Sequence, residues 1–304
     1  MKFNLNLILL VISLSATVSA QEPEFAIARV NYEFSHIRDT TQRDKPYKES
    51  MRLIIGKNAS LYTSEDNIIQ QERMTELIKQ QTAANGGTLS NIVMKKGLLR
   101  PVSLTDFYFF ANEKKMVTIE NMRERFRIDE DAAPIQWKIT KDTTSFSGIH
   151  CQKATARFKG RNWIAWFSPD LPFASGPWKL NSLPGLIIEA YDEHKDVQFT
   201  FSGFTKVSDT MTVKKNEILT LGTATLSVER NTHAGKEIKI PNNTVKATRA
   251  EVDKLKNALA ENPAAALNSL SGGTTTLKRI SAPSAPVAPV KSKFNNPIEL
   301  PEKK

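Results

Sequence analysis

The sequence has little of what builds disulfide scaffolds and metal centres. It contains one Cys and four His among 304 residues, which excludes a disulfide-stapled fold and a Cys-rich metal cluster. It lacks the G-x-S-x-G nucleophile elbow, the H-E-x-x-H zinc motif and a Gly-rich phosphate loop. These absences remove the enzyme classes that are most readily recognised from sequence.

What is present is the material for a packed domain. Hydrophobic residues make up 40% of the chain and charged residues 24%, a balance that excludes global disorder. The formal net charge is +10, with an excess of Lys and Arg in the last quarter of the chain. A basic region of this kind serves solubility or contacts anionic lipid headgroups. Because the chain has no nucleic-acid-binding motif, we expect no nucleic-acid partner.

The first twenty residues have the features of a secretory signal peptide. Lys2 is their only charge, residues 7–14 form a short apolar run, and small residues stand at 18–20, where cleavage is expected. The apolar run is too short to span a bilayer. The mature chain would begin at Gln21, and because this residue is not Cys we expect no lipid anchor. The sequence therefore predicts an exported protein with no transmembrane segment in the mature chain.

Most of the chain up to residue 213 divides into short strand-like segments separated by turns. In the segment 197–204, Val197 and Phe199 lie on one face and polar residues on the other, as in a half-buried antiparallel strand. Because no helical segments separate the strands after residue 104, we expect an antiparallel sheet rather than a doubly wound one. The expected strands are 26–36, 50–62, 107–110, 116–119, 123–128, 135–139, 151–159, 162–168, 186–191 and 197–204.

Two segments have the pattern of helices that flank such a sheet. Residues 65–84 contain no Gly or Pro and follow Ser64, a good N-cap residue, but their apolar stripe is narrow. Residues 248–260 begin with Thr248 and Glu251 in the spacing of a capping box. We expect both to be helical, the first lying on the surface.

The composition divides the chain into three parts. After the signal peptide at 1–20, we expect a single β-rich domain over residues 21–270. Residues 271–304 form a basic tail rich in Pro, Ala and Ser, with the composition of an extended or disordered linker. The end of this tail, residues 294–300, is more apolar, and we expect it to dock back on the domain.

All four Trp lie between residues 137 and 178, at Trp137, Trp163, Trp166 and Trp178. Trp163 and Trp166 occupy opposite faces of one predicted strand, so both faces of that strand carry large apolar groups. Large aromatic side chains occur in cores and at binding surfaces. Two interpretations are therefore open: both faces are packed by the protein itself, or one of them lines a ligand groove.

A Pro-Gly turn follows this strand and carries a family resemblance. The stretch "GPWKLNSLPGLIIEAYD" resembles the signature of the GLPGLI family of exported proteins, and the segment from Trp137 to Pro172 and the closing "NNPIEL" are similar to the rest of its pattern. Ser182 stands where the family hexapeptide has Gly, so Ser182 either avoids a positive φ or adopts one at some cost. Pro184-Gly185 suits a type II turn. The resemblance implies an exported protein of Gram-negative bacteria, in the periplasm or at the outer membrane, and it supplies no catalytic residues.

The segment is also similar to a broader pattern in periplasmic lipoprotein-carrier folds. Those folds are curved antiparallel sheets, half closed around helices, that hold an acyl chain or a peptide. We therefore expect a mainly β (α+β) fold: a curved antiparallel sheet, as a half-barrel, with two flanking helices. A function taken from this resemblance is analogy only.

Candidate chemical groups are few. Residues 192–196 combine Asp, Glu and His, which suits a solvated turn and also a metal site. His150 and His194 are the ligand pair that a metal-dependent enzyme would use. Cys151 has no partner in its own chain, and it is either a buried apolar residue or a reactive thiol.

The leading hypothesis is an exported, non-enzymatic binding or accessory protein that contacts a peptide, a lipid or an outer-membrane protein through a Trp-rich face. We expect no catalytic residue, no metal and no cofactor. Two alternatives stay open: an exported metal-dependent hydrolase, and an accessory subunit of an outer-membrane uptake complex. The predicted contact residues are Trp163, Trp166, Trp178, Leu183, Pro184, Gly185 and Leu186.

Overall fold

The computed structural model describes the predicted domain and the end of the predicted tail. The predicted signal peptide and residues 271–293 lie outside the described residues. The described residues are 23–86, 100–122, 124–132, 134–207, 217–221, 224–228, 237–261 and 294–302.

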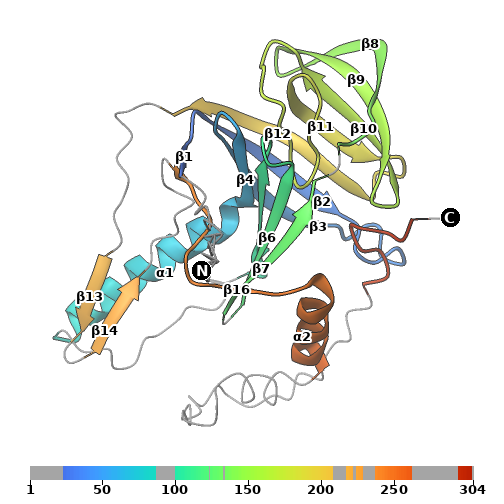
Figure 1. Ribbon diagram of the computed structural model, residues 1–304. Coiled ribbons are helices and arrows are strands. Elements are labelled where there is room, and N and C mark those ends of the chain that lie inside the picture. Colours follow the sequence, from blue (N-terminus) through green and yellow to red (C-terminus); the bar gives the residue numbers. More distant parts are fainter. Residues whose placement is uncertain are drawn as a thin grey trace, which may run out of the picture.

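One large sheet organises the described part of the chain. Its twelve strands pair antiparallel throughout, except that β16 is parallel to β7. The edges are β16 and β8, and the sheet bends so that β8–β12 turn away from β5–β7 (Figure 1). In spatial order the strands are β16 (Thr244–Lys246), β7 (Arg125–Asp131), β6 (Lys115–Asn121), β5 (Thr105–Phe110), β4 (Ala59–Ser64), β3 (Tyr47–Ile55), β2 (Ala28–His36), β12 (Val197–Lys206), β11 (Leu186–Asp192), β10 (Arg161–Ser168), β9 (Ile149–Phe158) and β8 (Lys138–Phe146).

The remaining described elements are two short strand pairs and two helices. Two further pairs are β1 (Glu24–Phe25) with β15 (Glu237–Ile238), and β13 (Glu217–Leu221) with β14 (Ala224–Val228). The helices are α1 (Glu65–Ala84) and α2 (Arg249–Glu261). The predicted fold class, a mainly β protein with a curved antiparallel sheet and two flanking helices, is confirmed, and the sheet is open.

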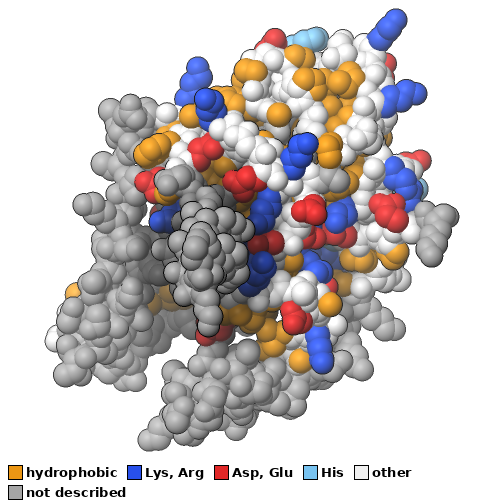
Figure 2. Space-filling model, in the orientation of Figure 1, with side chains coloured by type: hydrophobic (Ala, Val, Ile, Leu, Met, Phe, Trp, Pro, Cys, Tyr) orange, Lys and Arg blue, Asp and Glu red, His pale blue; other side chains and the backbone are white. Residues whose placement is uncertain are grey.

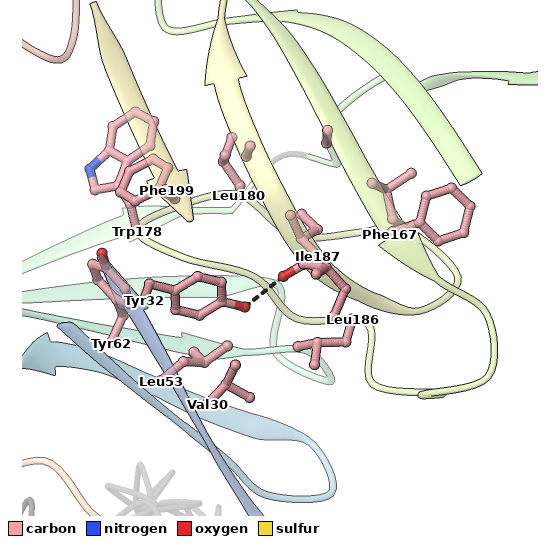
Figure 3. Close-up of a cluster of buried hydrophobic side chains, with 14 of the residues drawn as sticks. Val30, Tyr32, Leu53, Tyr62, Phe167, Trp178, Leu180, Leu186, Ile187 and Phe199 are labelled. Carbon is pink, nitrogen blue, oxygen red and sulfur yellow. Dashed lines mark hydrogen bonds between the residues drawn. The ribbon is translucent and has the colours of Figure 1, made fainter. Parts of the chain in front are cut away.

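The centre of the sheet is buried on both faces. The larger core cluster includes Tyr32, Leu53 and Ile187, and the smaller one, on the opposite face, includes Ile54 and Tyr108. Neighbouring residues on a strand point to opposite faces, so Leu53 and Ile54 belong to different clusters. Figure 3 shows the larger cluster, in which the Tyr32 hydroxyl donates to the Ile187 carbonyl at 2.6 Å. This hydrogen bond joins β2 to the start of β11 inside the core.

Both helices begin with the predicted caps. The Ser64 hydroxyl accepts from the Asn67 backbone N–H at 2.9 Å, and in α1 Ile68 is buried. Thr248 and Glu251 form the capping box, because the Glu251 carboxylate accepts from the Thr248 N–H at 2.7 Å. None of the helices in the described residues is long and apolar enough to cross a membrane.

Two strand predictions differ from the structure. The segment 50–62 is a hairpin of β3 and β4 rather than one strand, because Gly56-Lys57-Asn58 turns the chain. The strand expected at 135–139 is β8, which runs over Lys138–Phe146. A tight hairpin at Lys159-Gly160 joins β9 to β10: both residues have positive φ, 51° and 74°, as a type I′ hairpin turn requires.

Charges of both signs share the surface. Figure 2 shows Lys and Arg side chains interspersed with Asp and Glu across the middle of one face, while hydrophobic side chains gather over the part built from β8–β11. On this face, the described residues therefore present mixed charge rather than a basic patch, although the whole chain carries a net charge of +10.

Candidate functional site

A pocket of about 560 Å³ lies against strands β2 to β5 and β12. This volume falls in the range of small-molecule sites. Three further segments complete its walls: the loop that carries Trp178, helix α2, and residues 294–302. Residues 294–302 are here called the C-terminal segment. The lining residues are Phe34, His36, Arg38, Glu49, Met51, Tyr62, Ser103, Thr105, Phe107, Trp178, Phe199, Lys256, Asn257, Phe294, Asn296, Pro297 and Ile298.

Aromatic rings form the apolar wall of this pocket. Tyr62 contacts Phe199 with ring centroids 6.1 Å apart, and Phe199 stacks on Phe34 at 5.2 Å. Phe34 then meets Tyr47 edge to face at 6.2 Å. Strand pairing brings these rings together, because Phe199 on β12 lies opposite Phe34 on β2. The result is a continuous row of four rings, contributed by strands β4, β12, β2 and β3.

The buried end of the pocket holds a hydroxyl without a hydrogen-bond partner. Tyr62 is 3% exposed, and its hydroxyl oxygen makes no hydrogen bond to the described residues. Figure 3 shows this hydroxyl directed toward Phe199 and Trp178, whereas the neighbouring Tyr32 hydroxyl is paired. Burial raises the pKa of Tyr62 well above its ordinary value, so this hydroxyl is protonated and able to donate.

Glu49 is a buried carboxylate on the pocket wall, 2% exposed. One oxygen accepts from the Ser64 hydroxyl at 2.5 Å and from the Ser103 N–H at 2.7 Å. The other accepts from the Tyr47 hydroxyl at 2.6 Å. Three donors therefore satisfy the carboxylate, which fixes the start of α1 and the loop before β5 against β3.

His36 and Arg38 lie where the pocket meets the C-terminal segment. Burial lowers the pKa of His36 to about 4, so the ring is neutral at pH 7, and its Nε2 lies 2.8 Å from the Asn296 carbonyl. An oxygen acceptor at this distance assigns the proton to Nε2. The Arg38 guanidinium stacks on Tyr47 at 3.4 Å from the ring centroid and lies 5.4 Å from that of Phe294.

Asn296 anchors the C-terminal segment to the sheet. Its side-chain NH₂ donates to the Ile37 carbonyl at 2.7 Å and to Asp196 at 3.0 Å. Its side-chain oxygen accepts from Arg161 at 2.7 Å. Asn296 is 6% exposed, and a buried amide with all these partners defines one position for the segment. The prediction that residues 294–300 dock back on the domain is therefore confirmed by the contacts of Asn296.

Arg161 is the buried cation that receives this segment. It is 4% exposed and pairs with Asp192 at 2.6 Å. Its remaining donors reach the carbonyls of Pro297 at 2.6 Å and Ile298 at 2.8 Å. Without the C-terminal segment these donors would be buried and unpaired, which is costly. Sequence reasoning missed this role, because Arg161 and Asn296 are 135 residues apart.

The structure does not bring the predicted contact residues together on one surface. Trp178 lines the pocket, whereas Trp163, Leu183 and Leu186 are at most 1% exposed and pack in the larger core cluster. Trp166, on the other face of β10, is half-buried and contacts Phe146 and Lys153. Pro184 is exposed and Gly185 is buried, and neither lines the pocket. The expected Trp-rich surface is thus divided between core, pocket and outer face.

The Pro-Gly turn has a different geometry from the type II turn that the sequence suggested. The Gly185 N–H donates to the Leu183 carbonyl at 2.8 Å, which closes a three-residue turn around Pro184. A Cβ on Gly185 would lie 2.1 Å from the Ser168 carbonyl oxygen, so glycine is needed for the close approach of the two chain segments. Ser182 has a φ of 71°, which is the costlier of the two alternatives considered for it.

His150 and His194, the pair that the alternative metal-dependent enzyme would use, lie far apart in the sheet. Strand β10 lies between the strands that lead to the two His. Gln152, near His150, pairs with Phe167 of β10, and Asp192, near His194, pairs with Trp163 of β10. Phe167 and Trp163 are four residues apart on β10, which is about 13 Å at 3.3 Å per residue. His150 and His194 lie beyond these two positions, so one metal ion cannot bind both. Among the described residues, no group of three or more His, Cys, Asp and Glu side chains has a metal-binding arrangement.

Cys151 fits the buried-thiol alternative. Its side chain is fully buried in the larger core cluster, and burial raises the pKa of the thiol to about 11. The thiolate, which is the reactive form, is therefore scarce at neutral pH.

Comparison with known proteins gives little to add to this geometry. No protein-family model matches the chain, and no curated protein sequence matches it. Two solved structures of PNGF-II, in P21 and C2 crystal forms, are similar to it with TM-scores of 0.46 and 0.45 and 12% sequence identity. Each match covers 75% of this chain and 32% of the PNGF-II chain, so this chain spans about a third of the length of that protein.

Proposed function

We propose that this protein is an exported, non-enzymatic binding protein of the GLPGLI family, working in the periplasm or at the outer membrane, and that its aromatic pocket holds a small ligand with a large apolar part. The observation that carries the proposal is the 560 Å³ pocket, whose inner wall consists of buried aromatic side chains. Contact between water and such an apolar wall is unfavourable, so binding of an apolar group that displaces the water is favoured.

The polar groups around the pocket favour binding over catalysis. Glu49 is saturated by three donors, and His36 is neutral and hydrogen-bonded to Asn296. Groups held in this way define the shape of a site, whereas acid–base catalysis requires a group that exchanges a proton with substrate. Export is supported by the signal-peptide features of residues 1–20, and family membership by the Ser-Leu-Pro-Gly-Leu-Ile motif.

Native purification followed by mass spectrometry tests whether the pocket carries a ligand. We expect a co-purified small molecule with a large apolar part that is lost from the Phe34→Ala variant, because Phe34 lines the pocket. Phe146→Ala is the matched control, since Phe146 is a partly buried Phe packed against Trp166 away from the pocket. For a defined ligand, removal of the Phe34 ring weakens binding about tenfold. Equal retention of ligand by both variants, or no ligand in any form, contradicts the proposal.

A further inference from the structure

The pocket has a cation at its exposed end. Phe294 is 60% exposed and Asn257 and Pro297 are exposed, so these residues mark the mouth, whereas Tyr62 and Phe199 are at most 3% exposed and mark the interior. Arg38 lies with the mouth residues, because its guanidinium is 5.4 Å from the Phe294 ring. The pocket therefore runs from a charged entrance to an aromatic interior.

Arg38 differs from the other charged groups of the pocket. Lys256 is paired with Glu120 at 2.8 Å, and Glu49 is satisfied by three donors. Within the described part of the chain, Arg38 has no carboxylate at ion-pair distance; it is held by Tyr47, through stacking and a side-chain hydrogen bond. A guanidinium has five N–H donors, so one held by a single Tyr leaves donors available to a planar anion such as a carboxylate.

The interior end requires a second polar atom. The Tyr62 hydroxyl is buried and unpaired, and an unsatisfied buried donor is costly unless a ligand oxygen accepts its hydrogen bond. Strand β2 gives the length of the pocket. Tyr62, at the interior end, contacts Tyr32 of β2. His36, near Arg38 at the mouth, is four residues further along the same strand, so the two ends are about 13 Å apart at 3.3 Å per residue. The aromatic row between the two ends provides an apolar path of this length.

We infer that the pocket selects an anionic amphiphile whose carboxylate binds Arg38 and whose apolar chain carries an oxygen, as a hydroxyl or carbonyl, that accepts from Tyr62. This inference rests on the proposed function, since it names the ligand class of the same pocket. The match is one of charge at the mouth, apolar surface along the row of rings, and a single hydrogen-bond donor at the interior end.

Three twelve-carbon probes test the two polar contacts separately: 12-hydroxydodecanoate, dodecanoate and dodecanol, titrated by calorimetry into the full mature chain. We expect 12-hydroxydodecanoate to bind most tightly. Arg38→Gln weakens both carboxylates about tenfold or more and leaves dodecanol unchanged. Arg43→Gln is the matched control, because Arg43 is an exposed Arg that pairs with Asp196 and does not line the pocket.

Tyr62→Phe tests the interior contact while keeping the ring. We expect this variant to lose several-fold affinity for 12-hydroxydodecanoate and to bind dodecanoate as before. If dodecanol binds as tightly as the carboxylates and Arg38→Gln has no effect, the inference is wrong and the proposed function stands. If none of the three probes binds, and native preparations carry no molecule with a large apolar part, both are wrong.

Discussion

Ser182 occupies a backbone conformation that disfavours any residue with a Cβ. Its φ is 71°, and its side chain is exposed, with its hydroxyl donating to Asn181 at 2.6 Å. The left-handed region costs an L-residue about 1 kcal/mol or more relative to glycine. The conformation is imposed by the surrounding turn, in which Leu183 is buried and Gly185 packs against the Ser168 carbonyl.

We predict that Ser182→Gly is more stable than Ser182→Ala by about 1 kcal/mol. Both variants lack the hydroxyl, so the comparison isolates the cost of a Cβ at this φ. Urea unfolding of the two variants, followed by intrinsic Trp fluorescence, measures the difference. A Ser182→Ala variant as stable as Ser182→Gly would show that the turn relaxes to a negative φ.

Residue identity alone identifies some of the residues that line the pocket and not others. The sequence singled out Trp178, which lines the pocket, because Trp is a frequent binding residue. It also singled out Trp163 and Leu186, which are core residues, since large apolar side chains serve both roles. Arg38 and Tyr62 carried no local signal: their importance comes from the rings and the segment that strand pairing places beside them.

At the scale of elements, the C-terminal segment contributes both stability and one wall of the pocket. Asn296 is held by Arg161, Asp196 and the Ile37 carbonyl, and the Leu300 N–H donates to Lys159 at 3.0 Å. The close approach of Leu300 requires Gly160, because a Cβ there would lie 2.4 Å from the Leu300 carbonyl oxygen. The apolar character of this segment predicted its docking, but its hydrogen-bond partners come from strands far away in the sequence.

We predict that removal of residues 294–304 lowers the melting temperature and weakens ligand binding at least tenfold. Truncation leaves the Arg161 donors unpaired and removes the pocket wall formed by Phe294, Pro297 and Ile298. A synthetic peptide of residues 294–304, added in trans, is expected to restore both properties. The same peptide with Asn296→Ala is the control and should not restore them. Unchanged binding by the truncated chain would contradict this role.

At the scale of the whole molecule, the sequence predicted the fold class better than the site. Period-two alternation and short turns identify strands such as 197–204, and a run of strands without helices predicts an antiparallel sheet. The order of the strands in the sheet could not be predicted from the sequence in the same way. The pairing of β2 with β12 joins the first part of the sheet to the last, and nothing in the local pattern of either strand specifies its partner. The pocket depends on that pairing, because it brings Phe34 to Phe199.

Two groups, His36 and Glu189, change the stability of the whole protein in opposite directions between pH 8 and pH 5. Burial lowers the pKa of His36 to about 4, so the unfolded chain binds the proton first as the pH falls below 6.5, and stability is lost. Burial raises the pKa of Glu189 to about 7, so the folded chain binds the proton first as the pH falls through 7, and stability is gained. In the natural protein these two effects partly cancel.

Substitution of either group should therefore leave the pH dependence of stability that the other group causes. We predict that His36→Gln, which keeps a hydrogen-bond donor for the Asn296 carbonyl, becomes more stable as the pH falls from 7.5 to 5. We predict that Glu189→Gln becomes less stable as the pH falls over the same interval. From the His36 shift, the difference between the natural protein and His36→Gln changes by roughly 2 kcal/mol over this interval. Urea unfolding at both pH values measures the two slopes. Slopes of the same sign in both variants would mean that burial in the sheet does not shift these two pKa values in opposite directions.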